Sequence, residues 1–179
     1  MRPLLKIASL LVLTALPLSA APAALSVGAK APTFETQASV GGKDFSFALD
    51  KALKKGPVVL YFFPAAFTPG CTVEAHEFAE ATEDFTKLGA TVIGMAADPI
   101  DKLNKFSVEE CRNKFAVGVA TPAMISGYDV ALSMAPGRSN RTSYVIAPDG
   151  KIIFAYSALS PAGHVTGTMD AVKAWKAKH

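Results

Sequence analysis

The sequence predicts a layered α/β protein with a mixed central sheet and an N-terminal β-hairpin. Two apolar runs, 57–63 and 90–97, are rich in β-branched and aromatic residues and show no alternation, as in strands buried on both faces. Stretches with helical spacing follow each run, which is the order of a sheet covered by helices. A turn signal near the C-terminus joins two more strands as an antiparallel pair and makes the sheet mixed.

The first 23 residues are expected to be an export signal. A short basic region is followed by twelve mostly apolar residues, 7–18, and then by small residues. Twelve residues rise about 18 Å as a helix, whereas a bilayer core is about 30 Å thick. The predicted division is therefore a cleavable secretory signal peptide over 1–23 and one domain over 24–179, with cleavage after Ala23 or, less favoured, after Ala20.

The charge of the predicted mature domain argues against nucleic acid as a partner. The whole chain has a formal net charge of +3. The leader carries Arg2 and Lys6 and no acid, so the mature chain keeps 16 basic and 15 acidic residues, a net charge of +1. No basic cluster remains that would hold a phosphate backbone. We expect neither nucleic-acid binding nor stable membrane insertion, and export would place the two cysteines in an oxidising compartment, the bacterial periplasm.

The first elements of the domain are a hairpin and a short helix. Residues 34–40 and 43–46 are strand-like and flank Gly41-Gly42, a pair suited to a tight turn. Ser46 is expected to cap a short helix that ends at Gly56.

The central elements alternate strand and helix. Strand 57–63 leads through a loop to a helix over 71–88, where acidic residues crowd the first half and a lysine lies near the end, as the helix dipole favours. Strand 90–97 is followed by a helix predicted over 98–114, with a proline at an early position, and by strand 115–120.

The C-terminal third predicts a short helix, a hairpin and a last helix. The short helix is expected over 127–134, and strands 142–146 and 152–156 are joined by the turn 148–151. Apolar residues at helical spacing indicate a final helix over 164–178. In such sheets, binding and catalytic residues lie beyond the carboxyl ends of the central strands.

Cys71 is the strongest candidate for a reactive residue. The segment 61–74 runs from a buried strand through a loop into a helix, and Cys71 falls in the first helical turn. Free amides and the positive end of the dipole favour a thiolate there. The Thr68 hydroxyl can donate to the sulfur or to a bound oxygen, and Pro64 shapes the loop and shields it from water. The alternative is a buried structural thiol.

The motif Pro64-xxx-Thr68-xx-Cys71 resembles the active-site motif of peroxiredoxins. The run YFFPAAFTPGCTVEAHEF is similar to the bacterioferritin-comigratory-protein, or peroxiredoxin Q, branch, and the similarity extends from Val27 to the final helix. The resemblance implies a thioredoxin-like three-layer α/β/α fold and reduction of hydrogen peroxide and organic hydroperoxides through a Cys71 sulfenic acid. It also implies a thioredoxin-like or other thiol reductant, no cofactor, and a monomer or weak dimer.

The resemblance further implies an arginine near the thiol. Arg141, at the entry to strand 142–146, stands where the family has this residue. Its guanidinium would favour the thiolate and hold peroxide oxygens. Arg138 is the competing candidate, and a solvated loop charge is the alternative for either residue.

The sequence leaves two interpretations of the resolving step open. Many members of the branch have a second cysteine five positions after the first, but here that residue is His76, expected on the helix surface. The other cysteine, Cys111, lies on the predicted helix 98–114, where some members carry the resolving cysteine, although its position here is shifted by about one turn. We favour resolution by Cys111, as in an atypical 2-Cys enzyme; the alternative is a one-cysteine mechanism, with Cys111 a core residue on the stripe of Leu103, Ser107, Cys111 and Phe115.

Two other protein classes fit the sequence less well. A thioredoxin-like disulfide reductase would need C-x-x-C, and Glu74 occupies the second cysteine position. A non-enzymatic exported domain with a static Cys71–Cys111 disulfide is the remaining alternative. The three histidines and two cysteines do not have metal-ligand spacing, so no metal is expected.

Overall fold

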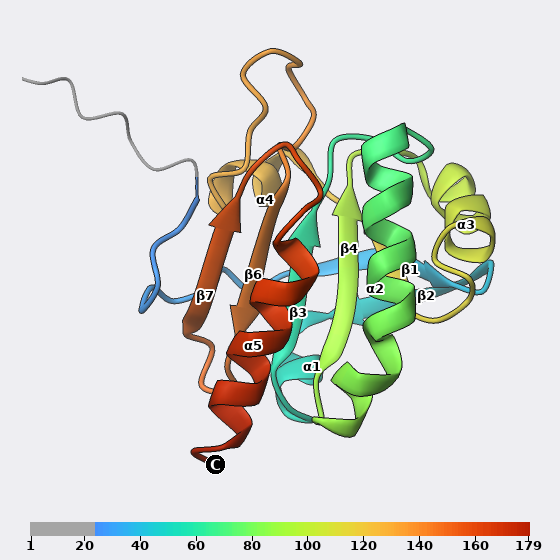
Figure 1. Cartoon of the computed structure of the whole chain (residues 1–179). Helices are drawn as coiled ribbons and strands as arrows, with labels where there is room; N and C mark the ends of the chain where they lie inside the picture. The colour runs from blue at the N-terminus through green and yellow to red at the C-terminus, as the bar shows by residue number, and fades with distance from the viewer. Residues whose placement is uncertain (1–23) are drawn as a thin grey trace, which may run out of the picture.

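The structure, a computed structural model, describes residues 24–179 and contains a seven-stranded mixed sheet (Figure 1). The predicted signal peptide, residues 1–23, lies outside the described residues. In chain order the elements are β1 (Glu35–Val40), β2 (Lys43–Ala48), α1 (Leu49–Leu53), β3 (Val58–Phe62), α2 (Pro69–Lys87), β4 (Thr91–Ala96), α3 (Ile100–Glu109), β5 (Ala116–Val119), α4 (Pro122–Gly127), β6 (Thr142–Ile146), β7 (Ile152–Ser157) and α5 (His164–Lys176).

The strand order is β2-β1-β5-β4-β3-β6-β7. Strands β3, β4 and β5 are parallel, whereas β6 runs antiparallel to β3 and pairs Thr142 with Phe62. The start of β6 therefore lies beside the carboxyl end of β3. This register brings the residue before Thr142 to the loop that leads from β3 into α2.

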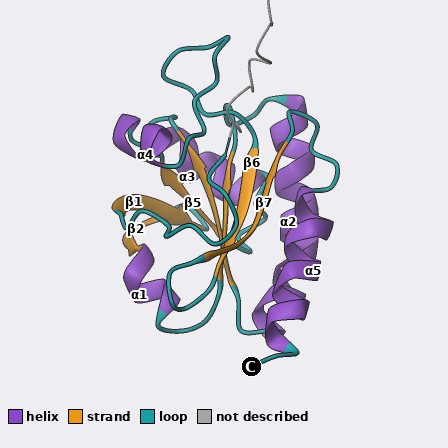
Figure 2. Cartoon of the chain, turned by 90° about the vertical axis from the view of Figure 1, so that its left-hand side faces the viewer, coloured by secondary structure: helices purple, strands orange, loops and turns teal. Residues whose placement is uncertain are grey.

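Helices cover both faces of the sheet, as Figure 2 shows for α1 and α4 on one side and α2 and α5 on the other. Strand β3 explains the layering, because Val58, Leu60 and Phe62 belong to the core with α1 and α4. The alternate residues of β3 pack in the second core with α2, α3 and α5. Burial of both faces is the reason that β3 reads as a continuous apolar run. No helix within residues 24–179 is long and apolar enough to cross a bilayer.

Two predicted helices were misplaced. The helix expected to begin at Ser46 begins at Leu49, because Ser46 lies in β2 and its hydroxyl donates to Glu35 (2.6 Å). The helix expected over 127–134 is instead α4, which ends at Gly127. The Thr121 hydroxyl caps α4 by accepting the Met124 amide at 3.3 Å. The sequence signal for this start is Thr121 followed by Pro122.

The helix predicted over 98–114 is also shorter than expected. It ends at Glu109, so Cys111 lies in the following turn and not on the helix. Arg112 and Asn113 have φ values of 51° and 59°, in the left-handed region that reverses the chain. The predicted stripe of Leu103, Ser107, Cys111 and Phe115 is nevertheless buried throughout. Helical spacing continued in the sequence after the helix itself had ended.

Candidate active site

Cys71 lies in the first turn of α2, at the carboxyl end of β3, and is 1% exposed. The helix begins at Pro69, two residues earlier than predicted, and its first helical bond runs from the Thr72 amide to the Thr68 carbonyl (2.9 Å). The amides of Gly70 and Cys71 precede that bond and have no carbonyl partner within the helix. These amides and the helix dipole favour negative charge at the thiol.

Arg141 is the cation that contacts this thiol. Its Nη2 lies 3.4 Å from Cys71 Sγ, its Nη1 donates to Glu74, and its Nε donates to the Leu159 carbonyl at 2.9 Å. A Cβ at Gly70 would lie 3.1 Å from Nη2, so the glycine allows this close approach. The guanidinium is buried, and its charge therefore acts on the sulfur with little screening.

Arg138, the competing arginine, holds the loop and does not contact the thiol. Its Nη1 donates to Asp98 (2.9 Å), which also binds Lys102 (3.0 Å) and the Ala66 amide (2.8 Å). Burial alone would raise the pKa of Asp98, but the Ala66 amide, Arg138 and Lys102 outweigh burial and hold that pKa below its ordinary value. Asp98 thus anchors the segment that precedes α2.

Thr68 and Pro64 lie in the same anchored loop. The Thr68 hydroxyl donates to the Ala65 carbonyl at 3.0 Å, not to the Cys71 sulfur, and it does not cap α2. Its proton is therefore used inside the loop, while its oxygen remains able to accept a hydrogen bond from a substrate. Pro64 is half-buried between β3 and this turn.

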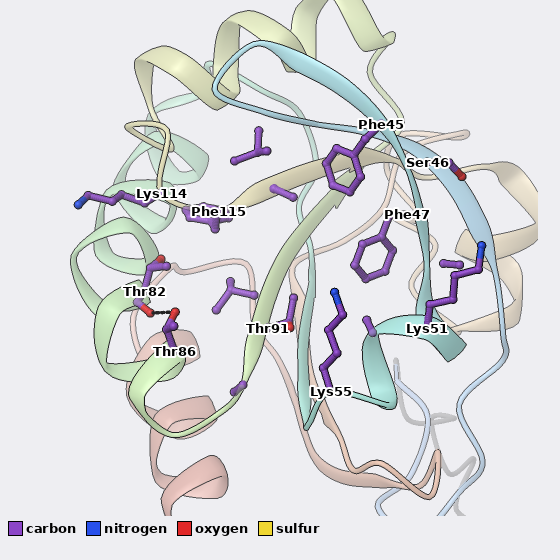
Figure 3. A pocket seen from close by; sticks show the side chains of 16 residues that line it. Phe45, Ser46, Phe47, Lys51, Lys55, Thr82, Thr86, Thr91, Lys114 and Phe115 are labelled. Atoms are coloured by element: carbon purple, nitrogen blue, oxygen red, sulfur yellow. Dashed lines mark hydrogen bonds between the residues drawn. The ribbon is translucent and has the colours of Figure 1, made fainter.

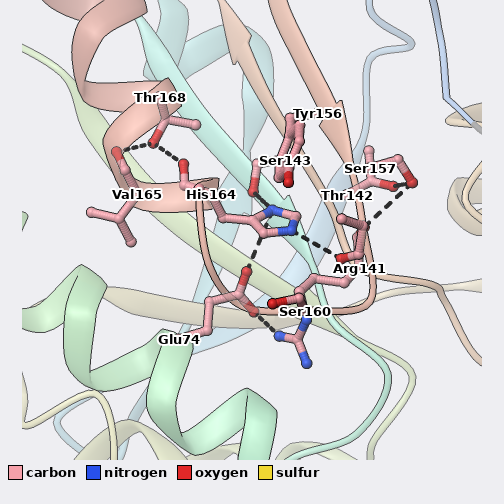
Figure 4. A network of polar contacts seen from close by, with 12 residues as sticks. Glu74, Arg141, Thr142, Ser143, Tyr156, Ser157, Ser160, His164, Val165 and Thr168 are labelled. Atoms are coloured by element: carbon pink, nitrogen blue, oxygen red, sulfur yellow. Dashed lines mark hydrogen bonds and ion pairs between the residues drawn. The ribbon is translucent and has the colours of Figure 1, made fainter.

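Glu74 and His164 were not identified as site residues from the sequence. Glu74 lies one turn after Cys71, is fully buried, and binds Arg141 through Oε2. Burial raises the pKa of Glu74 to about 8, against the opposing effect of Arg141. The His164 Nδ1 lies 3.7 Å from Glu74 Oε1 (Figure 4). The sequence signal for Glu74 was an acidic residue among the apolar positions on the buried face of α2. No sequence signal pointed to His164, because it begins a helix far along the chain.

Cys111 has a different setting. It is a free thiol, as is Cys71, and it is fully buried in the same apolar core. Burial raises its pKa well above the ordinary value. His76 contacts Glu110, the residue before Cys111, at 2.7 Å and makes no such contact with Cys71. The structure thus places Cys71 and Arg141 in contact, whereas the Cys111 sulfur makes no side-chain hydrogen bond within residues 24–179.

A cavity of about 510 Å³ lies elsewhere on the molecule. It is lined by aromatic side chains of β2, threonines of α2 and lysines at and after α1 (Figure 3). None of the residues assembled around Cys71 lines it, so it is not the site of thiol chemistry. Within residues 24–179 no group of three or more His, Cys, Asp or Glu side chains is arranged to hold a metal ion.

Comparison with known proteins gives concordant matches. The AhpC/TSA family model matches residues 27–155. A putative peroxiredoxin of Mycobacterium tuberculosis is 32% identical over 154 residues, covering 79% of this chain and 90% of the relative. Peroxiredoxin Bcp of Bacillus subtilis is 27% identical over 155 residues, with coverages of 83% and 96%.

Solved structures agree in fold. The crystal structure of peroxidoxin BcpB from Mycobacterium tuberculosis has a TM-score of 0.74 and 30% identity, and the match covers 83% of this chain and 96% of that one. AhpC of the same organism has a TM-score of 0.75 at 17% identity, covering 87% and 96%, a likeness that concerns the fold alone. The predicted thioredoxin-like fold is confirmed.

Proposed function

The chain belongs to the AhpC/TSA family and is a thiol-dependent peroxidase of the Bcp type, and on this premise we propose that Cys71 is the thiol that attacks the peroxide. The contact between Arg141 and the Cys71 sulfur supports the assignment, since it is the only cation–sulfur contact of either cysteine within residues 24–179. The helix amides add to the same effect.

The reaction is a displacement at oxygen. The Cys71 thiolate attacks the terminal peroxide oxygen, an S–O bond forms and the O–O bond breaks. The attacked oxygen keeps its hydrogen, giving the sulfenic acid, and the departing oxygen takes a proton from solvent to leave as water or an alcohol. Arg141 and the amides of Gly70 and Cys71 stabilise the charge that moves onto the departing oxygen, while Thr68 accepts from the peroxide O–H.

The direct test is peroxide consumption in the presence of a thiol reductant. Cys71→Ser should abolish it, whereas Cys111→Ser, a matched loss of one thiol, should retain the first turnover. If Cys71→Ser consumes peroxide as fast as the parent protein, the assignment is wrong.

Resolution by Cys111 is the second part of the proposal. The Cys111 thiol attacks the sulfenic sulfur, a disulfide forms, water leaves, and a dithiol reductant then restores both thiols. Because both thiols are buried and unlinked, the turn that carries Cys111 must open first. The left-handed residues Arg112 and Asn113 make that turn the strained part of the segment.

Peptide mapping without reduction tests this step. After one equivalent of peroxide, we expect a peptide pair joined by Cys71 and Cys111. Recovery of Cys71 only as a sulfenic acid or as a mixed disulfide with an added thiol would favour the one-cysteine mechanism, with Cys111 a core residue.

Organic hydroperoxides are expected substrates beside hydrogen peroxide. Phe67 and Leu159 are apolar side chains 38% and 52% exposed next to the site, and the Leu159 carbonyl binds Arg141 directly. They offer an apolar rim for an alkyl group. Leu159→Ser should lower kcat/KM for cumene hydroperoxide by about fivefold, the scale of a partly buried leucine, and leave hydrogen peroxide unchanged. An equal loss for both substrates would contradict this role.

Export to the periplasm rests on the sequence of residues 1–23. Cell fractionation and N-terminal sequencing should find a periplasmic protein that begins at Ala24. A cytoplasmic protein that keeps Met1 would contradict export.

Sedimentation of the purified protein is expected to show a monomer or weak dimer, and a stable higher oligomer would contradict that expectation.

A further inference from the structure

Arg141 is shared by two acidic groups. One nitrogen contacts the Cys71 sulfur and another contacts the Glu74 carboxylate, and all three side chains are buried. If Glu74 and Cys71 were both ionised, two negative charges would share one cation out of contact with water. Such an arrangement is costly, and one of the two acids is expected to keep its proton.

The position of His164 indicates which acid keeps it. The His164 Nε2 lies 3.0 Å from the Ala158 carbonyl, which can only accept, so Nε2 carries the ring proton. The other nitrogen, Nδ1, then presents a lone pair, which receives a hydrogen bond from the Ser143 hydroxyl at 2.8 Å. Glu74 Oε1 faces the same nitrogen at 3.7 Å and has no hydrogen-bond partner within the described residues (Figure 4).

We propose that Glu74 keeps its proton, with Oε1 facing the unprotonated Nδ1 of His164, while Cys71 reacts as the thiolate. His164 is then a positioning residue: it keeps Glu74 neutral, so that the charge of Arg141 acts on the sulfur and on the departing oxygen. The inference deepens the proposed function and rests on Cys71 as the attacking thiol. No proton leaves Glu74 during the reaction.

The groups around Glu74 support this state. Arg141 faces it from the start of β6, His164 from α5 and Tyr61 from β3, while Cys71 and Glu77 are its neighbours on α2. Burial raises the pKa of Glu74 to about 8 and lowers that of His164 to about 4. At neutral pH both groups are therefore uncharged, which matches a buried carboxyl group that faces an unprotonated ring nitrogen.

Ionisation of Glu74 has a predictable consequence. The carboxylate would face the lone pair of His164 and would compete with the sulfur for Arg141. Transition-state charge on the departing oxygen would then be less stabilised. We expect the rate of peroxide reduction to fall about tenfold as the pH rises through the ionisation of Glu74, near 8.

The experiment is a pH profile of single-turnover peroxide consumption by the pre-reduced protein. All variants are made in the Cys111→Ser protein, so that only one thiol remains. The rate of peroxide consumption by the Cys111→Ser protein itself should fall above pH 8. Glu74→Gln, which has no proton to lose at this position, should lack the alkaline step, whatever its rate at pH 7. His164→Phe should move that step about one pH unit lower, because the ionised carboxylate would no longer face the electron-rich Nδ1. The double variant should show no step.

Ser143→Ala and His179→Phe serve as further variants. Ser143→Ala frees Nδ1 for Glu74 and should move the step to higher pH, whereas His179→Phe, an exposed histidine near the C-terminus, should leave the profile unchanged.

The inference is overturned if the alkaline step persists in Glu74→Gln, or if His164→Phe lowers the rate equally at every pH without moving the step. Both results leave the role of Cys71 standing, because that role depends on Cys71→Ser alone.

Discussion

The two cysteines are equally buried but have opposite surroundings. Cys71 lies at a helix N-terminus with Arg141 against its sulfur and Glu74 behind the arginine. Cys111 lies in a turn after α3, inside an apolar core, where burial raises its pKa. Burial alone therefore does not decide the reactivity of a thiol here. The charges and free amides near the sulfur distinguish Cys71, the proposed attacking thiol, from Cys111, which becomes accessible only when its turn opens.

Removing the charge beside Cys71 should have the largest effect. Arg141→Gln should lower kcat/KM for hydrogen peroxide by about 100-fold or more, the scale seen when one preorganised donor to a developing charge is removed. Arg138→Gln is the matched control, since Arg138 binds Asp98 and not the thiol, and it should cost less than about tenfold. Equal losses in the two variants would mean that Arg141 acts only by holding the loop.

The two thiols should also differ in alkylation. Because the thiolate is the nucleophile, Cys71 of the reduced protein should react with iodoacetamide at pH 7 about 100-fold faster than Cys111. Mass spectrometry of the two tryptic peptides over time gives both rates in one sample. Similar rates would remove the distinction between the two surroundings.

Arg141 was favoured over Arg138 from the family resemblance and from its place at the start of strand 142–146, which was predicted with its observed bounds. Strand β3 and helix α2 were likewise predicted from an apolar run and a helix start. These features depend on local sequence, whereas the antiparallel pairing that brings the start of β6 beside the end of β3 is shown by the structure.

Glu74 and His164 could not be paired in the same way. Their contact depends on how α5, near the end of the chain, packs on α2, and no local pattern reports that packing. The turn at Cys111 was missed for a related reason. Its left-handed residues, Arg112 and Asn113, are not glycines, and the apolar spacing continued through them.

The buried acid at the Cys71 end should make stability depend on pH. The folded-state pKa of Glu74 is about 8, above its ordinary value of 4.5. The stabilisation of the folded protein that comes from this difference is fully present below pH 4.5 and is lost as the pH rises to 8. The pKa of His164 is lowered from 6.5 to about 4, so this residue changes the stability only below pH 6.5. Between pH 6.5 and 8, the unfolding free energy of Glu74→Gln should rise relative to the parent by about 2 kcal/mol.

Urea denaturation of both proteins at several pH values measures this difference. A constant difference between the two proteins over pH 6.5 to 8 would mean that Glu74 is already ionised in the folded state at neutral pH.

The smallest effect is expected at the Cys111 turn. Arg112 adopts a φ of 51°, which glycine tolerates without strain, so Arg112→Gly should stabilise the reduced protein by about 1 kcal/mol. Asn113→Gly should gain less, because asparagine tolerates this conformation. The closed turn would be favoured, and disulfide formation after peroxide should slow. Faster disulfide formation in Arg112→Gly would argue against opening of this turn as the step that releases Cys111.

The assignment of the attacking thiol is tested most directly by trapping the sulfenic acid. Each single-cysteine variant is treated with one equivalent of hydrogen peroxide in the presence of a dimedone-type probe and analysed by peptide mass spectrometry. The adduct should form on Cys71 in the Cys111→Ser protein and should be absent from Cys111 in the Cys71→Ser protein. An adduct on Cys111 alone would contradict the assignment of Cys71 as the peroxide-reducing thiol.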